Sequence, residues 1–424
     1  MKSKSLLLSL IAGMIFSSCQ QLSKWLDITP NETFTTFVKK GQYCEINLKT
    51  QVIGSNNLAI KQFHQEILQK NTQFDFFTKA VLLGLFQLDT RPDQTAPDSR
   101  FQIFIYDGKR WQYRDFNDVM DSPAEKSNPY IDGLRWISSQ TKEKKSLESI
   151  ARQLDSVIPK YVFVGPELAK WLDSNKFTFM KFDVFREHYF KGDQIVVYGE
   201  SVLSLKHASL IKKYSSSRIK ANIIDSLPFS QTTKGTDVTH SCNFDQKLYE
   251  NMIFSKNDPK RINANVFGLQ DSQGRVFIGI SSLKNPKLNP ESDQFLLEAE
   301  NPLRPVPFCI LERDKDLFAL AGNQGIDPAQ HLVQLQSLSL ETSEGLPGLE
   351  QRLMQARSLF LVNPARVAVE TQLISERELA ELHHYNIPVY HADQLGEVWS
   401  WMKSYGSSGF VADPRFERGV LCLP

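Results

Sequence analysis

Hydrophobic positions near the start of the chain recur with the period of an α-helix. Between residues 57 and 69, apolar side chains stand three and four positions apart, so they line one face of a helix. Residues 74–88 are apolar nearly all round, which is typical of a buried helix. The two stretches together predict an N-terminal helical hairpin. Residues 89–100 contain prolines and lack apolar periodicity, which predicts a loop after it.

Alternation of apolar and polar residues predicts β-hairpins farther along the chain. The first is closed by Asp107-Gly108, because the glycine accepts the positive φ of a tight turn. The predicted hairpins comprise residues 101–106 with 110–113, 263–270 with 275–281, and 308–312 with 317–321. We expect the last four of these strands to form an antiparallel meander.

Short apolar runs alternate with helix-like stretches in two other regions. In the first half the runs are 161–164, 177–182, 194–198 and 219–224. Near the C-terminus the predicted strands are 359–362, 387–390 and 410–412. Between them, a capping box of Ser375 and Glu378 begins one predicted helix, and residues 393–405 form another that Gly406 closes. Such alternation is typical of a parallel or mixed sheet.

These patterns predict an α/β or α+β protein, with two mixed α/β units that contain β-hairpins after an N-terminal helical segment. The Ser-, Thr-, Pro- and Gly-rich interval 225–245 predicts a long loop at the midpoint. The expected organisation is a signal peptide at 1–18, a lipid-anchored helical segment at 19–95, and α/β units at 96–245 and 246–424.

The N-terminus has the pattern of an export signal. Two lysines precede an apolar run at residues 6–16, which is too short for a membrane span of about 20 residues. Phe16-Ser17-Ser18-Cys19 resembles the bacterial lipobox, and this resemblance implies cleavage before Cys19 and diacylation of its thiol. Ordinary secretory cleavage is the alternative. By the sorting rule of enteric lipoproteins, Gln20 implies attachment to the outer membrane of the cell envelope.

Composition excludes several classes of protein. Hydrophobic residues make up 41% and charged residues 23% of the 424 residues, as in ordinary packed proteins. The formal net charge is +1, so no general electrostatic attraction to nucleic acid is expected. Phosphate-binding glycine motifs and zinc-type Cys/His spacing are absent from the sequence. We therefore expect no cofactor, no metal and no nucleic-acid partner.

Four cysteines follow Cys19. In an exported chain an even number of cysteines permits two disulfides, in three connectivities. Four buried thiols that pack as small hydrophobic side chains are the alternative, because a chain of this length does not need covalent links to be stable. Both interpretations stay open for Cys44, Cys242, Cys309 and Cys422.

Two resemblances to enzyme families are partial. His188, Lys191 and Asp193 before the strand-like run 195–199 look like one half of a phospholipase D-like protein, but the spacings are three and two where that family has two and five. The C-terminal stretch 387–414 is similar to the closing strands of a glycerophosphodiesterase barrel, without that family's metal-binding carboxylates. Neither resemblance carries catalytic chemistry over to this chain.

One candidate ligand site arises from the predicted C-terminal strands. Ligands of open α/β sheets bind beyond the carboxyl ends of parallel strands. There the predicted strands run into Asn363, His391 and Asp413, an amide, an imidazole and a carboxylate that together suit binding or acid–base chemistry. Polar turn residues without function are the alternative.

The sequence leads to two hypotheses about function. The first is a cell-envelope lipoprotein, attached to the membrane through its N-terminal lipid, whose domains bind a protein or small-molecule partner without catalysis. Its basis is the anchor together with the lack of a complete catalytic motif. The alternative is an envelope hydrolase with an atypical site, such as a divergent phosphodiesterase or phospholipase D-like protein. A concave pocket that gathers polar reactive side chains would favour the enzyme.

Overall fold

The computed structural model describes residues 43, 51–117, 127–214, 220–232, 238–247, 261–283, 287–288, 297–298, 305–313, 316–337, 345–362, 365–370, 372–384, 388–404, 407–416 and 419–423. The chain divides into a small unit, Met1–Phe37 with Gln355–Leu395, and a large unit, Val38–Met354 with Gly396–Pro424. The predicted leader, Cys19 and Cys44 lie outside the described residues. Within those residues no helix is long and apolar enough to cross a membrane.

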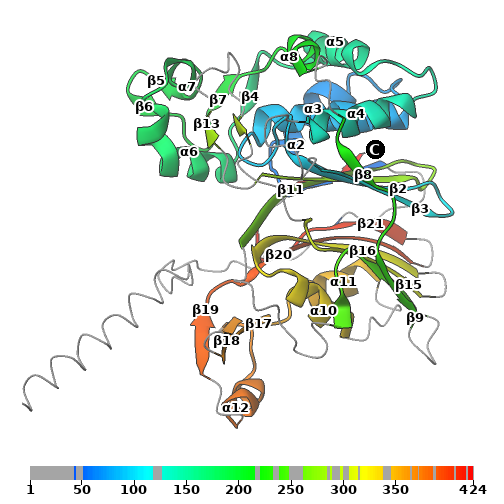
Figure 1. The fold of residues 1–424 in the computed structure, drawn as a ribbon, viewed down its shortest axis with the longest axis vertical. Helices are drawn as coiled ribbons and strands as arrows, with labels where there is room; N and C mark the ends of the chain where they lie inside the picture. The colour runs from blue at the N-terminus through cyan, green and yellow to red at the C-terminus, as the bar shows by residue number, and fades with distance from the viewer. Residues whose placement is uncertain are drawn as a thin grey trace, which may run out of the picture. The chain divides into compact units, whose positions relative to one another are not determined.

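The centre of the large unit is an antiparallel sheet that curls into two layers (Figure 1). The first layer contains, in spatial order, β8 (Asn222–Ile224), β3 (Trp111–Asn117), β2 (Arg100–Tyr106), β12 (Val276–Ser282), β11 (Arg261–Gln270), β1 (Gln51–Ser55) and β22 (Gly419–Leu423). The second contains β9 (Phe229–Thr232), β10 (Val238–Cys242), β15 (Phe308–Arg313), β16 (Asp316–Ile326), β20 (Gly396–Ser404) and β21 (Ser407–Val411). β11 pairs with β16 and so connects the two layers.

Alternate residues of the strands build the three hydrophobic clusters of this unit. In β2, Phe101, Ile103 and Ile105 face the first helical layer, whereas Phe104 faces the second sheet layer. The cluster between the layers also contains Trp399 and Trp401 of β20. A third cluster lies between the second sheet layer and its own helices. The order of layers is therefore helix, sheet, sheet, helix.

Helices cover the outer face of each sheet layer (Figure 1). Over the first lie α2 (Ile60–Gln62), the π-helical turn η1 (Phe63–Leu68), α3 (Phe76–Thr90), α4 (Pro129–Ser139), α5 (Leu147–Val157) and α8 (His207–Tyr214). Over the second lie α10 (Ala329–Ser337) and α11 (Gly345–Leu353). The buried α3 begins at Asp75, whose carboxylate accepts hydrogen bonds from the Phe77 and Thr78 amides.

Short elements complete both units. In the large unit they are β4 (Tyr161–Phe163), α6 (Pro166–Phe179), α7 (Asp183–Tyr189), β5 (Phe190–Lys191), β6 (Gln194–Ile195), β7 (Ser201–Leu203), β13 (Lys287–Leu288) and β14 (Leu297–Glu298). The small unit contains β17 (Ser358–Val362), β18 (Ala365–Glu370), α12 (Glu376–His384) and β19 (Val389–Ala392). Its β17 and β18 are antiparallel, whereas β18 and β19 are parallel.

The mixed α/β class predicted from the sequence is confirmed. The N-terminal helical hairpin and the β-hairpins β2–β3, β11–β12 and β15–β16 are present as well. The last four of these strands are antiparallel neighbours, but their spatial order is β12-β11-β16-β15 rather than that of a simple meander. The capping box of Ser375 and Glu378 is formed at the start of α12.

Three expectations about the architecture are wrong. The first half of the predicted strand 177–182 lies in α6 and the rest follows the end of that helix, and the sheet of the large unit is antiparallel rather than parallel or mixed. The predicted helix 393–405 contains β20 instead. A boundary near residue 245 does not separate two units, because β2 pairs with β12 and β1 pairs with both β11 and β22. These pairings join residues distant in sequence, which local patterns do not reveal.

Candidate active site

The two sheet layers part along β11. Its first residues pair with β16, ending with Asn263 opposite Gln324, and from Ala264 onward it pairs with β12. Beyond the end of β1, Asn56 continues the hydrogen-bonding of the sheet: its side-chain oxygen accepts from the Val266 amide at 2.9 Å, and its side-chain nitrogen donates to the Ala264 carbonyl at 2.8 Å. β11 is thus held in place while its partner on one side changes.

β16 changes partner at the same level. One edge of this strand pairs with β15 up to Ala321 and with β11 from Gln324 onward, and the register shifts between Gly322 and Gln324. Bulges of this kind are common beside active sites. Asn323 lies within the irregularity and is fully buried, yet among the described residues neither atom of its carboxamide group has a hydrogen-bond partner. The polar side chain is therefore removed from water without a hydrogen bond to another protein group in its place.

A network of buried amides and hydroxyls lies on the helix-facing side of β11. Its members, which we call the junction cluster, are Asn57, Gln87, Thr90, Thr95, Asn265 and Ser281. Asn265 donates at 3.0 Å to both Gln87 Oε1 and Thr95 Oγ1. Thr95 Oγ1 in turn lies 2.6 Å from Ser281 Oγ. Within the described part of the chain, the Asn265 side-chain oxygen has no hydrogen-bond partner.

The loop that carries Thr95 is itself fixed by polar contacts. Arg91 and Asp93 form a buried ion pair with N–O distances of 2.9 and 3.0 Å. The Thr95 amide donates to the Arg91 carbonyl at 2.8 Å, and the Ala96 amide donates to Ser99 Oγ at 2.6 Å. The hydroxyl of Thr95 is therefore held rigidly against β12.

The chemistry of the junction cluster follows from its composition. All six side chains are neutral, and their hydrogen bonds run to other amides, hydroxyls or main-chain groups. An unpaired buried polar atom costs about 1–3 kcal/mol, so such atoms persist where a ligand or a reaction uses them. The two adjacent hydroxyls suit attack on a neutral carbonyl group, and the unpaired Asn265 oxygen can accept a hydrogen bond from a ligand.

A buried histidine nearby has a different role. His207 lies between Asp89, 2.6 Å from Nε2, and Asp155, 2.9 Å from Nδ1. Burial opposes the imidazolium charge, but the two carboxylates outweigh burial and raise the pKa of His207 to about 9. A general base works best with a pKa near the operating pH, so this protonated, fully paired group links α3, α5 and α8 instead.

The ligand site predicted at strand ends is not assembled as expected. β17 and β19 flank β18 in one sheet with opposite directions, and β21 pairs with β20 in another. Asn363 lies outside the described residues, and His391 is exposed on β19. Asp413 is fully buried, 3.2 Å from Arg415 and accepting the Val398 amide at 3.1 Å. The common edge fails because β17 is antiparallel to β18, whereas β19 is parallel to β18, so the carboxyl ends of β17 and β19 lie at opposite edges of the sheet.

The residues that resembled phospholipase D are also dispersed. Burial lowers the pKa of His188 on α7 to about 4. Lys191 instead pairs with Glu200 at 2.7 Å, and Asp193 is exposed. Residues 407–411 of the barrel-like tail belong to an antiparallel strand, β21. Neither resemblance corresponds to a site in the structure.

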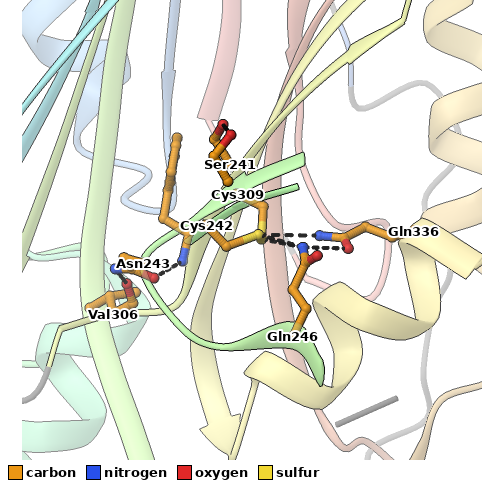
Figure 2. Close-up of a disulfide and its surroundings, with 9 residues drawn as sticks. Ser241, Cys242, Asn243, Gln246, Val306, Cys309 and Gln336 are labelled. Carbon is orange, nitrogen blue, oxygen red and sulfur yellow. Dashed lines mark hydrogen bonds between the residues drawn. A yellow bond between two sulfur atoms is a disulfide. The ribbon is translucent and has the colours of Figure 1, made fainter. Parts of the chain in front are cut away.

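The structure contains one disulfide among its described cysteines (Figure 2). Cys242 and Cys309 are direct neighbours on β10 and β15, with Cα atoms 4.2 Å apart. The Gln246 side-chain amide donates to Cys242 Sγ at 2.6 Å. Cys422 lies opposite Val52 between β22 and β1. Within the described residues, no group of three or more His, Cys, Asp or Glu side chains is arranged to hold a metal ion.

Comparison with known proteins identifies the architecture. No family model and no curated protein matches the chain. Among solved structures it is similar to LmbA2991HD, with a TM-score of 0.63 and 10% identity over 90% of this chain and 99% of that one. It is similar to cephalosporin acylase from Bacillus halodurans, with a TM-score of 0.62 and 10% identity over 93% and 99%. At this identity the likeness shows a shared fold.

These neighbours correct the functional hypotheses drawn from the sequence. The expectation of a non-catalytic binding protein is contradicted, because the neighbours that share the fold over nearly the whole chain include a hydrolytic enzyme. The phospholipase D alternative is contradicted too, because neither solved structure reported as sharing the fold is named a phospholipase D. Sequence reasoning missed Asn265 and Asn323. The available signal was an asparagine within an otherwise apolar strand pattern.

Proposed function

We propose that this protein is a hydrolase of amide bonds, acting by acyl transfer to a hydroxyl group. The observation that carries the proposal is the four-layer architecture shared with cephalosporin acylase over 93% of the chain. That acylase is one of the N-terminal-nucleophile hydrolases. The junction cluster supports the proposal, because it places two hydroxyls beside Asn265, whose side-chain oxygen is unpaired, at the point where the two sheet layers part.

We assign the attacking hydroxyl to the Thr95–Ser281 pair. Ser281 is the less hindered alcohol, and its hydroxyl pairs with that of Thr95 among the residues that the structure describes. Attack also requires a base, and the cluster is neutral. In enzymes with an N-terminal nucleophile that base is an α-amine freed by cleavage of the chain. Ser281 lies inside β12, so the amine would have to come from a cleavage that leaves a new N-terminus beside the Thr95–Ser281 pair. It would take the Ser281 proton as the ester bond forms and give it to the amine that leaves as the amide bond breaks. Because cleavage changes the mass of the chain, the mass of the purified protein is measured as part of the test.

The experiment combines turnover with trapping of the acyl-enzyme. The purified mature chain is incubated with a panel of N-acyl p-nitroanilides and acylated cephalosporins, and the acylated residue is identified by peptide mass spectrometry. We expect Ser281→Ala to lower kcat/KM by roughly 10³-fold or more, as loss of a nucleophile does. Ser230→Ala is the matched control, because Ser230 forms a similar hydroxyl pair with Ser241, 3.1 Å away, outside the cluster.

Three results separate the parts of this proposal. Failure to hydrolyse or to be acylated by any member of the panel overturns the function. A label on a new N-terminal residue of a cleaved chain supports the hydrolase but overturns the assignment of the Thr95–Ser281 pair. An equal loss of kcat/KM in the Ser230→Ala control would show a general effect of removing strand hydroxyls, and it would overturn the assignment of the Thr95–Ser281 pair.

We propose further that the chain is exported and anchored through lipid on Cys19. The lipobox-like sequence supports this, and the Cys242–Cys309 disulfide is of a kind that persists in oxidising compartments. Two or three acyl chains would tether the protein stably, whereas one would not. We expect Cys19→Ser to abolish palmitate labelling and to release the protein into the soluble envelope fraction. Unchanged labelling would refute the anchor.

A further inference from the structure

Exposed apolar side chains are concentrated in one part of the large unit. Ten large hydrophobic side chains are exposed among the described residues, and six of them belong to the segment 161–203. The six are Tyr161, Phe177, Met180, Val197, Tyr198 and Leu203. The helices α6 and α7 and the strands β4 to β7 of this segment lie together beside the helices of the first layer (Figure 1). Single exposed hydrophobic residues are ordinary, whereas a concentration of them marks a binding surface.

The antiparallel strands β4 and β7 present several of these side chains on one face. Tyr161 lies directly opposite Leu203, so their side chains point to the same side of the pair. Alternation along β4 places Phe163 on this side as well. The ring of Tyr198 packs edge-on against that of Phe163, with the centroids 5.7 Å apart. We call this surface, made of Tyr161, Phe163, Tyr198 and Leu203, the β4–β7 face.

The β4–β7 face is supported from behind and from one edge. The valines that point away from it, Val162 and Val202, are buried in the hydrophobic core. Gln62 binds the edge of β4 that faces away from β7: its side-chain oxygen accepts from the Phe163 amide and its nitrogen donates to the Tyr161 carbonyl, both at 2.9 Å. A surface held in this way loses little conformational freedom when it binds.

A lysine side chain lies beside the exposed ring of Tyr161. Lys160 Nζ is 5.4 Å from the centroid of this ring, within the range of a cation–π contact. The carboxylate of Glu200, two residues after Tyr198, pairs with Lys191 at 2.7 Å, so its negative charge is balanced. The β4–β7 face therefore combines apolar side chains with a positive charge at its margin.

The last turn of α6 repeats this combination. Phe177 is 74% exposed, and Lys176 Nζ lies 5.4 Å from the centroid of its ring. Met180, three residues farther on, is exposed as well. An exposed aromatic ring with a lysine beside it thus occurs twice in the same segment.

This chemistry matches a membrane surface better than a protein partner. At a membrane interface, aromatic and aliphatic side chains enter the headgroup level while lysines attract anionic headgroups. A stable protein interface buries about 800 Å² on each partner and is depleted in lysine. The β4–β7 face is smaller, since it consists of four side chains on and beside two strands of three residues.

We propose that the β4–β7 face docks on a membrane that contains anionic lipid. This contact is separate from any lipid on Cys19 and does not depend on the proposed hydrolase activity. Residues 20–50 can span up to about 100 Å between Cys19 and β1, so a lipid anchor alone would not fix which side of the protein faces the membrane. A docked β4–β7 face would fix it.

The test measures binding of the mature chain to lipid vesicles without a lipid anchor. The chain carries Cys19→Ser and is sedimented with vesicles of equal parts phosphatidylglycerol and phosphatidylcholine, or of phosphatidylcholine alone. We expect binding to the mixed vesicles and weaker binding to the neutral ones, because each lysine near an anionic surface contributes about a factor of five. The double variant Tyr161→Ser, Leu203→Ser should bind the mixed vesicles at least about tenfold more weakly, because it removes two large apolar side chains from the contact.

The matched control is the double variant Ile223→Ser, Ile224→Ser, which removes two exposed apolar side chains from β8, outside the segment 161–203. It should bind the vesicles as the parent chain does. Circular dichroism shows whether each variant is folded. Lys160→Glu changes an exposed side chain only, and it should weaken binding to the mixed vesicles even if the double variant of the face does not fold.

A fluorescence measurement locates the contact. Tryptophan introduced by Leu203→Trp should be quenched by brominated phosphatidylcholine in the mixed vesicles, whereas tryptophan introduced by Ile224→Trp should not. Failure to sediment with the mixed vesicles, an equal loss of binding in the β8 control, or an unquenched Leu203→Trp overturns the proposal. A dimer in sedimentation velocity that Tyr161→Ser with Leu203→Ser abolishes would show that the face binds a second copy of the chain, and it would overturn the membrane contact as well.

Discussion

Polar side chains in the interior of this protein divide into those with complete hydrogen-bonding and those without. Asn56 satisfies main-chain groups of β11, and Asn57 caps the turn before α2 while it donates to Thr90. Asn265 is partly satisfied and Asn323 not at all. All four look alike in the sequence, as asparagines in apolar surroundings. Their partners come from distant segments, so only the structure distinguishes a structural asparagine from a candidate ligand-binding one.

This distinction predicts opposite effects of the same substitution on stability. Asn323→Leu removes an unpaired buried amide and should raise the free energy of unfolding by about 1–3 kcal/mol. Asn265→Leu should lower it by a similar amount, because it removes the two hydrogen bonds that Asn265 donates to Gln87 and Thr95. Urea denaturation of the two variants measures both. An equal loss of stability in the two variants would contradict the distinction between the unpaired Asn323 and the hydrogen-bonded Asn265.

The pairing of His207 predicts how stability depends on pH. Its pKa is raised from 6.5 to about 9 in the folded protein by Asp89 and Asp155, which outweigh burial. The stabilisation is therefore fully present below pH 6.5 and is lost as the pH rises through about 9. We expect the free energy of unfolding of the wild-type chain to fall across this window. The variant His207→Gln should be less stable than the wild-type chain at pH 6, and its free energy of unfolding should change less between pH 6.5 and 9. An unchanged dependence of this free energy on pH would refute the role assigned to His207.

At the scale of elements, the sequence predicts hairpins well and buried strands poorly. β2–β3 and β11–β12 follow from alternation and a glycine turn, because one tight connection fixes both partners. The helix predicted at 393–405 relies on the glycine that follows it, Gly406, whereas the strand β20 within this range is apolar on both faces. Trp399 and Trp401 face the other sheet layer, whereas Val398 and Met402 face the helices. A strand covered on both faces loses the alternation that would identify it.

The two-sided burial of β20 predicts a large cost for truncating its side chains. Trp399 is fully buried and its ring lies 4.7 Å from that of Phe410, centroid to centroid. Trp399→Ala should lower the free energy of unfolding by about 3–5 kcal/mol, as loss of a buried aromatic side chain does. Val197→Ala, at an exposed position of the same unit, should change it by less than about 0.5 kcal/mol. Similar values for the two variants would contradict the position of β20 in the core.

At the scale of the whole molecule, the topology joins segments that no local pattern connects. β1 and β22, near opposite ends of the described chain, are neighbours, and β2 lies beside β12. The sequence therefore predicted the class and many elements but divided the large unit wrongly. The candidate site lies where β11 passes from one sheet layer to the other, a place defined only by these long-range pairings. For the same reason its residues were not found from motifs.

The disulfide is the covalent counterpart of these long-range pairings, and it leads to the last prediction. Cys242 and Cys309, 67 residues apart, join β10 to β15. By closing a loop of that length the bond restricts the unfolded chain, an effect typically worth about 2–4 kcal/mol.

We expect the double variant Cys242→Ser, Cys309→Ser to unfold at lower urea concentration than the oxidised wild-type chain, and reduction of the wild-type chain to lower its stability to a similar level. The reductant should leave the double variant unchanged, so this variant serves as the control for effects of reduction elsewhere, including at Cys422. Equal stability of oxidised and reduced wild-type protein would show that these cysteines act only as packed thiols.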